Sequence, residues 1–245
     1  MRILIPSYHR ADRMKTVHYL CGICGISATD ITISLQDDAD IENYKKFGCD
    51  LHYAPATNVA GNRNNGLRYL RAKYPGEDIV MFDDDIDYLL LLTKEGDRKH
   101  AITRKLKGEE LITILSSLFE YASKKEASLW GINALDNPLF MKTKVLQNII
   151  LAGGVMGFVG GGKELYFDEE FALKEDYELS LRAMQQGERI LKFCMLAPRT
   201  NFRAPGGCTE VRKKQSESKF ANRLLEEYAG IIKADPRRPG EIKMI

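Results

Sequence analysis

Three consecutive aspartates, Asp83, Asp84 and Asp85, directly follow a short apolar segment at residues 79–82. Carboxylates this close together repel one another unless a cation lies among them, and a hard divalent ion that also carries phosphate oxygens is a common solution. Such an ion can bridge the phosphates of a nucleoside diphosphate and stabilise that group as it leaves. The same run could instead form a solvated loop or cap a following helix, so the aspartates alone leave both interpretations open.

The elements that must position these aspartates alternate between strand and helix, which is typical of an α/β fold with a mostly parallel sheet. Ligands collect at the carboxyl ends of parallel strands, so the aspartates lie where a site is expected. Apolar runs predict strands at residues 2–6, 30–35, 50–53, 79–82, 128–133 and 145–159. Apolar spacing predicts helices at residues 12–21, 58–73 and 109–124, and a further helix, strand and helix follow residue 175.

Two segments have no predicted regular structure. Residues 93–107 are polar and rich in Lys and Arg, which indicates a loop, and the chain after the last helix reads as an irregular tail that contains residues 236–240. We expect one domain at residues 1–200, followed by a C-terminal loop, helix and tail at residues 201–245 that close over the donor site.

The composition is that of an ordinary globular protein, because 44% of the 245 residues are hydrophobic and 29% are charged. A net charge of +2 is too small to indicate a nucleic-acid binder by itself, so any basic surface must be local. Five cysteines do not form the dense pattern of a small secreted protein, and Cys21 and Cys24 are expected to be core residues. No apolar stretch has transmembrane length and no secretion signal precedes the first strand, so we expect a cytoplasmic protein.

Three further motifs flank the aspartates in a fixed order. Residues 5–10 (Ile-Pro-Ser-Tyr-His-Arg) follow the first strand, residues 61–67 (Gly-Asn-Arg-Asn-Asn-Gly-Leu) open a helix, and residues 175–179 (Glu-Asp-Tyr-Glu-Leu) begin a later helix. Together with residues 83–85, this order resembles the GT-A fold glycosyltransferases, especially the inverting family 2 type. The resemblance covers roughly residues 2–195 and implies a single Rossmann-like GT-A domain that binds a nucleotide sugar, with UDP as the expected nucleotide.

The resemblance also implies a role for each matching position. The positions beside the nucleotide base and the diphosphate are Pro6, Ser7, Tyr8 and Arg10, with Gln36 or Asp37 near the base. Arg63 and Asn64 match a polar pair that contacts the nucleotide, and the planar fork of an arginine suits phosphate oxygens. An exposed helix face is the alternative interpretation of this pair.

Within the acidic motif, the resemblance places Asp83 at the ribose and makes Asp85 the ligand of Mn²⁺ or Mg²⁺. Asp84 lies between them and is grouped with the nucleotide-sugar site without a specific contact. Asp176, next to Glu175, matches the catalytic base that takes a proton from the acceptor hydroxyl, although a carboxylate at a helix start could also be an ordinary cap.

One feature departs from the family pattern. Many relatives complete the metal site with a histidine after the last core strand, and none of the four histidines of this chain lies there. Arg203, Cys208 or the run at residues 212–214 could contact the diphosphate instead.

Gly154 belongs to a glycine-rich segment at residues 152–160, where the family binds the acceptor and the donor sugar, and glycine there allows close approach to the backbone. The size of the chain and residues 201–208 are similar to the TET-associated glycosyltransferases of bacteriophages. That similarity implies 5-hydroxymethylcytosine in double-stranded DNA as the acceptor, in the cytoplasm of an infected bacterial cell. The residues expected to contact DNA are Arg98, Lys99, Lys105 and Phe158.

Other functions remain open. A family 2-like enzyme could instead act on a hydroxyl of a polysaccharide, lipid or protein, and an inactive DNA-binding or phage structural module would need no metal ion. A nucleotidyltransferase also uses metal carboxylates on an α/β sheet, but it normally carries an early glycine-rich phosphate loop, which residues 6–9 do not resemble.

Overall fold

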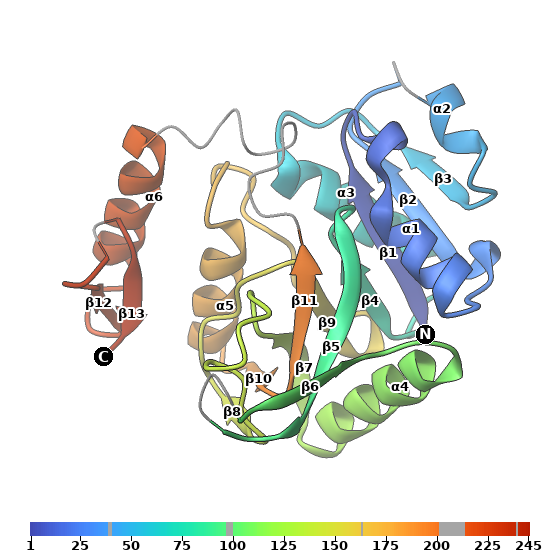
Figure 1. Ribbon diagram of the computed structural model, residues 1–245. Helices are drawn as coiled ribbons and strands as arrows, with labels where there is room; N and C mark the ends of the chain where they lie inside the picture. Colours follow the sequence, from blue (N-terminus) through green and yellow to red (C-terminus); the bar gives the residue numbers. More distant parts are fainter. Residues whose placement is uncertain (39–40, 97–99, 163, 201–213, 239) are drawn as a thin grey trace.

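The computed structural model describes residues 1–38, 41–96, 100–162, 164–200, 214–238 and 240–245, with the side chains of the last helix from residue 218 onward. Within these residues, an eight-stranded sheet has the order β3-β2-β1-β4-β9-β7-β10-β8 (Figure 1). Its strands are β1 (Arg2–Ser7), β2 (Ile31–Leu35), β3 (Asp50–Tyr53), β4 (Ile79–Phe82), β7 (Ala127–Ile132), β8 (Val145–Gln147), β9 (Val155–Phe158) and β10 (Arg189–Phe193). Strands β9 and β8 run antiparallel to their neighbours, and the other strands share one direction, so the sheet is mostly parallel.

Helices cover both faces of this sheet. On one face, α3 (Val59–Lys73) and α5 (Glu175–Gln185) pack their apolar side chains against Leu4, Met81 and other core residues. On the other face lie α4 (Glu109–Lys124) and an N-terminal helical segment. That segment comprises η1 (Ala11–Arg13), α1 (Lys15–Val17) and the π-helix η2 (His18–Ile23). A further short helix, α2 (Ile41–Lys45), follows β2.

A smaller antiparallel sheet lies beside the large one in the described part of the chain, in the order β11-β5-β6. Its strands are β5 (Ile86–Lys94), β6 (Ile102–Lys105) and β11 (Leu196–Thr200). The prediction of a loop over residues 93–107 was therefore wrong for its second half, because β6 pairs with β5 as the return strand of a hairpin.

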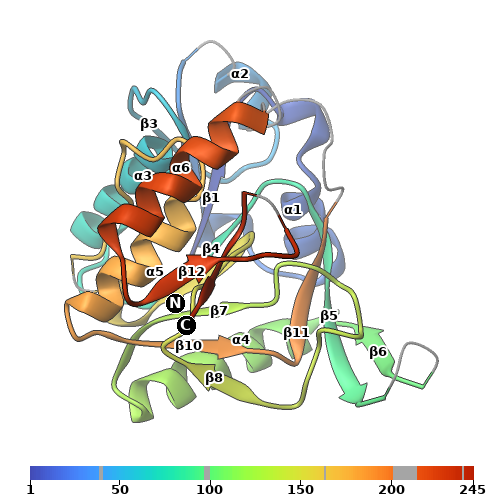
Figure 2. The same cartoon turned by 90° about the vertical axis from the view of Figure 1, so that its left-hand side faces the viewer.

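The C-terminal unit consists of α6 (Lys214–Glu227) and a hairpin formed by β12 (Ile232–Ala234) and β13 (Ile242–Met244). Figure 2 shows α6 and the hairpin beside α5. Ala221, Leu224 and Ile242 share an apolar cluster with Leu181 of α5, which explains why the unit packs there. The prediction of an irregular tail after α6 was therefore wrong in part, because the tail contains this hairpin.

Two other predicted elements differ in detail. The helix expected at residues 12–21 is divided among η1, α1 and η2, and the strand expected at residues 145–159 is two separate strands, β8 and β9. The predicted helix at residues 58–73 is confirmed as α3, whose first turn is capped because the Asn58 side chain accepts a hydrogen bond from the Gly61 amide at 3.0 Å. Short 3₁₀ turns occur at η3 (Ala28–Asp30) and η4 (Val159–Gly162).

Trp130 of β7 lies at the centre of the core and is 0% exposed. Its ring contacts Phe119 and Phe193 edge-on, with ring centres 5.1 Å and 5.8 Å away. A Cβ atom on Gly157 of the neighbouring strand would lie 2.0 Å from the indole, so only glycine leaves room for the ring there.

Among the described helices, none combines the length and the apolar character that crossing a membrane requires.

Candidate active site

The predicted functional segments meet at one edge of the large sheet. β1 and β4 end at this edge, and β9 begins there because it runs antiparallel to β4, with Val155 opposite Phe82. The helices α3 and α5 also begin there, since the Asn62 side chain donates to the Ser7 carbonyl at 3.1 Å and the Asp176 carboxylate receives the amide of Gly153. The edge matches the place where parallel α/β sheets bind ligands.

Asp84 is the buried member of the acidic triplet, with 7% of its side chain exposed. Ser7 Oγ donates to one carboxylate oxygen at 2.7 Å and Arg10 Nη1 donates to the other at 2.8 Å. Tyr44 supports both partners, because its hydroxyl lies 2.7 Å from Ser7 Oγ and accepts the Arg10 amide at 3.0 Å. Burial raises the pKa of Asp84, whereas Arg10 and Ser7 lower it. These contacts lock the segment after β1 to the end of β4.

Arg63 of α3 joins two segments that are far apart in the chain. Its guanidinium donates to Asp83 at 2.8 Å and to Glu175 at 2.6 Å. Only 6% of the Arg63 side chain is exposed, against 37% for Asp83 and 10% for Glu175. Charge-assisted hydrogen bonds of this kind are strong in a buried setting, so Arg63 fixes the end of β4 relative to the start of α5.

Asp176 is half-buried at the first turn of α5. Its two carboxylate oxygens accept the backbone amides of Gly153 at 3.2 Å and of Tyr177 at 2.9 Å. Burial raises the pKa of Asp176, and Arg63 together with the two amides opposes that shift. Burial also raises the pKa of the adjacent Glu175 to about 7, against the influence of Arg63. Carboxylates whose pKa values are raised in this way are candidates for proton transfer.

Asp85 is more accessible than Asp84, with 24% of its side chain exposed and its nearest cation, Arg10 Nη1, at 3.5 Å. Burial raises the pKa of Asp85 to about 6, and the charges of Asp83 and Asp84 raise it further, whereas Arg10 and Lys15 lower it. Lys15 does not pair with Asp85, because its ammonium pairs with Asp87 at 2.9 Å.

The charge of the site favours an added cation. Among the described residues, the guanidinium groups of Arg10 and Arg63 face five carboxylates, which are those of Asp83, Asp84, Asp85, Glu175 and Asp176. A diphosphate brought to this edge would meet an excess of negative charge unless a divalent ion came with it. The described residues contain no cluster of three or more His, Cys, Asp or Glu side chains arranged to hold a metal. The oxygen donors that a hard divalent ion prefers are present at this edge in the partly exposed carboxylates of Asp83 and Asp85.

Gly154 is required for this arrangement. Its carbonyl accepts the Asp83 amide at 2.7 Å, and a Cβ atom at this position would lie 2.8 Å from the Asp83 carboxylate. A larger residue would therefore push the Asp83 side chain out of its contact with Arg63.

The remaining residues predicted to bind the nucleotide line the edge beside β1. Pro6 is buried within β1, whereas Tyr8 is 38% exposed, with its ring centre 4.1 Å from that of His9. His9 Nε2 lies 3.0 Å from Asp37, and the Gln36 carbonyl accepts the Ala56 amide. Tyr8, Gln36 and Asp37 thus lie along the rim next to the Asp84 contacts.

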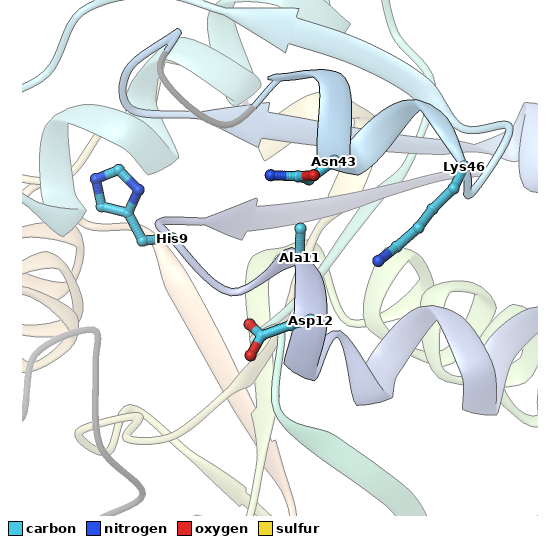
Figure 3. A pocket seen from close by; sticks show the side chains of 5 residues that line it. All are labelled: His9, Ala11, Asp12, Asn43 and Lys46. Carbon is cyan, nitrogen blue, oxygen red and sulfur yellow. The ribbon is translucent and has the colours of Figure 1, made fainter.

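A polar cavity of about 370 Å³ opens next to this rim (Figure 3). It lies between the segment after β1 and the region of α2, and its lining residues are His9, Ala11, Asp12, Asn43 and Lys46. None of the carboxylates that Arg10 and Arg63 contact lines it, so it adjoins the acidic edge and is separate from it.

Two predicted site residues lie elsewhere. Asn64 is 1% exposed, and its amide group pairs with the backbone of Phe167 in both directions, at 2.9 Å and 2.8 Å. Its side chain holds the segment before α5 and does not face the acidic edge. Phe158 is 0% exposed in the core under α3 and α5, so the expectation that it contacts DNA is wrong.

The basic segment expected to contact DNA is only partly described. Lys105 is exposed on β6, with its ammonium 3.9 Å from the centre of the Tyr88 ring. Arg104 pairs closely with Glu110 and is less available. Arg98 and Lys99 lie outside the described residues, as do Arg203, Cys208 and the side chains of the run at 212–214.

Sequence reasoning missed two supporting residues, Tyr44 and Thr16. Thr16 Oγ1 donates to the Asp83 carbonyl at 2.5 Å and accepts the Ile86 amide at 3.0 Å, which fixes the turn that carries the aspartates. Neither residue has a distinctive sequence neighbourhood, and both act only because separate elements pack against the site.

No protein-family model matches the chain, and no curated protein matches it either. Solved structures share its fold at low sequence identity. A mannosyltransferase from Pyrobaculum calidifontis, in complex with GDP-Man and Mn²⁺, has a TM-score of 0.52 at 13% identity, over 96% of this chain. A mycobacterial protein has a TM-score of 0.54 at 9% identity, covering 100% of this chain and 83% of its own length.

A third match is S. aureus TarS residues 1–349 in complex with UDP, with a TM-score of 0.47 at 13% identity, over 92% of this chain and 66% of that one. This chain spans 65% of the length of the mannosyltransferase. The similarity confirms the predicted fold class, an α/β GT-A fold built on a mostly parallel central sheet.

Proposed function

We propose that the protein is a glycosyltransferase that moves a sugar from a nucleotide sugar, with UDP as the expected nucleotide, to an acceptor hydroxyl. One observation carries this proposal: Arg63 contacts both Asp83 and Glu175, so the aspartate turn and the start of α5 form one frame. The proposed diphosphate site at Asp85 and the proposed base, Asp176, adjoin the two ends of this frame. The fold shared with a mannosyltransferase solved with GDP-Man and Mn²⁺ supports the same function.

In the proposed reaction, Asp176 accepts the proton of the acceptor hydroxyl. The acceptor oxygen forms a bond to the anomeric carbon, the bond from that carbon to the diphosphate breaks, and the electron pair leaves with the diphosphate. Burial makes Asp176 more basic than an exposed aspartate, and the amides of Gly153 and Tyr177 orient its two oxygens. Attack from the face opposite the leaving group would invert the anomeric centre.

Asp85 is the residue that would hold a divalent ion, Mn²⁺ or Mg²⁺. When bound, the ion supplies positive charge to the departing diphosphate. Asp83 lies beside it, 37% exposed and oriented by Arg63, where it can accept hydrogen bonds from ribose hydroxyls. Arg10 and Ser7 both donate hydrogen bonds to the buried Asp84, so they stabilise the turn that carries Asp83 and Asp85.

Sugar-nucleotide turnover tests the donor half of the proposal. Turnover of a panel of sugar nucleotides should require Mn²⁺ or Mg²⁺, stop in chelator, and be lost in Asp85→Ala. Asp87→Ala is the matched control, because Asp87 lies two residues further on, pairs with Lys15 and should keep activity. Full turnover in chelator would remove the metal from the mechanism, and no turnover of any sugar nucleotide would contradict the proposed function.

For the acceptor, we propose 5-hydroxymethylcytosine in duplex DNA, as in phage DNA within an infected cell. The small sheet exposes Lys94 and Lys105, and the adjoining loop exposes Leu135 and Phe140, at 45% and 55%. Cations mixed with apolar and aromatic groups suit a nucleic-acid strand and an unstacked base. Thr200, the last residue of β11, pairs with Ile86, which directly follows the three aspartates. We propose that residues 201–245, which follow Thr200, close over the donor.

Mass spectrometry of the acceptor tests this assignment. Duplex DNA containing hydroxymethylcytosine should gain the mass of one sugar per modified base when Mn²⁺ and the correct sugar nucleotide are present. Unmodified duplex of the same sequence should gain none. Transfer to a polysaccharide, lipid or protein hydroxyl, with none to DNA, would replace this acceptor and keep the glycosyltransferase.

A further inference from the structure

Lys174, which directly precedes α5, has an unusual backbone conformation. Its φ and ψ angles are 62° and 24°, in the left-handed region that favours glycine. A residue with a side chain is strained in this region, and it keeps the conformation only when its surroundings impose it. Its carbonyl accepts the Glu178 amide at 3.0 Å, in the first hydrogen-bonded turn of the helix that carries Asp176. The conformation of Lys174 therefore sets how α5 begins.

The side chain of Lys174 is held by the C-terminal hairpin. Only 9% of this side chain is exposed, and its ammonium pairs with Glu241 Oε2 at 2.9 Å. The ammonium also lies 4.8 Å from the centre of the Tyr177 ring. Glu241 is itself fixed, because its amide donates to the Arg238 carbonyl and its carbonyl accepts the Asp235 amide, both at 2.9 Å.

The unit that carries Glu241 is anchored along the rest of α5. Tyr228 donates its hydroxyl to Glu178 at 3.1 Å, and Ile242 shares a buried cluster with Leu181. Arg223 reaches back to Glu170, in the segment before the helix, at 2.9 Å. The hairpin therefore cannot move relative to the body of α5 without breaking several contacts, and Glu241 transmits that fixed position to Lys174.

Resting on the proposed function, we infer that Glu241 and Lys174 are positioning residues for the proposed base, Asp176. The Glu241–Lys174 ion pair holds the residue before α5 in its strained conformation. That conformation sets the first turn of α5 and aims the Asp176 carboxylate at the Gly153 amide. The C-terminal hairpin thereby becomes part of the catalytic frame.

Lys174→Met separates positioning through the ion pair from local backbone preference. Methionine keeps a long side chain in the left-handed conformation but removes the cation, so kcat should fall about tenfold in Lys174→Met and in Glu241→Gln. Lys174→Gly should keep most of its kcat, because glycine adopts this conformation without the ion pair. The KM for the sugar nucleotide should stay within about twofold, because the residues that face the donor are untouched. Lys174→Arg should recover most of the lost kcat because it restores the cation.

The matched control is Lys243→Met, which removes a cation from the same hairpin. Lys243 is 44% exposed and lies 3.9 Å from Asp235, away from Lys174. Its loss should leave kcat within about twofold of the unchanged protein. Equal losses in Lys243→Met and Glu241→Gln would show that the hairpin tolerates no change, and would overturn a specific role for the ion pair.

Hydrogen exchange gives a readout that does not depend on sugar transfer. The Glu178 amide, which donates to the Lys174 carbonyl, should exchange at least tenfold faster in Lys174→Met and Glu241→Gln and at the original rate in Lys243→Met. Unchanged exchange in the first two variants overturns the inference. If exchange changes as expected but the unsubstituted protein transfers no sugar, the proposed function fails and the anchoring of α5 by the hairpin stands.

Discussion

The two arginines of the site are used in different ways. Arg10 serves a carboxylate that is 7% exposed, and Ser7 and Tyr44 complete the hydrogen bonds around that carboxylate. Arg63 divides its donors between Asp83, which is 37% exposed, and Glu175, the neighbour of the proposed base. Arg10 therefore mainly holds the fold and also lies 3.5 Å from Asp85, whereas the Arg63 side presents carboxylates to a ligand. We expect proton transfer on the Arg63 side, and stabilisation by the buried Asp84 on the Arg10 side.

Asp176→Asn gives the largest expected effect and tests whether the Arg63 side carries the chemistry. An amide cannot accept the acceptor's proton, so kcat should fall by about 10²–10⁴-fold with little change in donor KM. Asp136→Asn is a control on an exposed pair with Arg199, where no loss is expected. Steady-state kinetics and thermal melting distinguish lost chemistry from lost folding, and a variant that keeps most of its kcat would refute Asp176 as the base.

Asp84→Ala tests the stabilising role of the Arg10 side. Removing one partner of a buried ion pair leaves Arg10 without its main counter-charge, and the free energy of unfolding should fall by about 3 kcal/mol. Asp83→Ala should cost about 1 kcal/mol or less, because Asp83 is partly solvated and Arg63 keeps Glu175. Urea unfolding measures both values. Equal losses would show that the two sides do not differ in the way described above.

The pH dependence of stability and of activity should have opposite signs. Glu175 and Asp85 have pKa values raised to about 7 and about 6, above those of the unfolded chain. Their protonation therefore stabilises the folded state at acid pH, and this stabilisation is lost as the pH rises from about 4.5 to about 7. We expect the free energy of unfolding to be higher at pH 5 than at pH 7.5 from this source.

Sugar transfer should instead rise over the same interval, since a base and a metal ligand must be ionised. Glu175→Gln should flatten the pH dependence of stability, because it removes the group with the higher of the two pKa values. Urea unfolding and initial rates at matched pH values measure both curves. A pH dependence of stability that remains unchanged in this variant would place the responsible group elsewhere.

Lys105→Gln is expected to have the smallest effect and tests whether the surface outside the two arginine groups binds the acceptor. If Lys105 contacts a phosphate, the slope of log K against log salt for duplex DNA should decrease by about 1. Lys124→Gln is the control, because Lys124 is 70% exposed on α4 and pairs only with a residue on its own helix among the contacts described. Equal slopes in both variants would remove Lys105 from the acceptor surface.

The sequence predicted the segments of this site better than their contacts. Asp83, Asp84 and Asp85 could be located because they follow an apolar strand, and Arg63 because it opens a helix. The contact between Arg63 and Glu175 joins residues 112 positions apart, and it depends on how α3 and α5 pack across the sheet. Nothing local indicates that Asp84 turns inward while its neighbours turn outward.

Errors in the prediction have related causes. Phe158 lies in a glycine-rich segment that the family resemblance assigned to acceptor binding, but it pairs with Ile79 and Leu129 inside the sheet and is buried. The return strand of the β5–β6 hairpin was missed because a Lys-rich stretch has no apolar alternation. β11, the other partner of β5, follows it by about a hundred residues, so the small sheet has no local signature.

The packing of Trp130 has a spectroscopic consequence. It is the single tryptophan of the chain, and its indole lies between Gly157, Phe119 and Phe193 with no exposure to solvent. Its fluorescence should therefore be blue-shifted in the native protein and move to longer wavelength on unfolding. Because Trp130 makes none of the polar contacts of the acidic edge, this emission reports the integrity of the core separately from the charges that the variants alter.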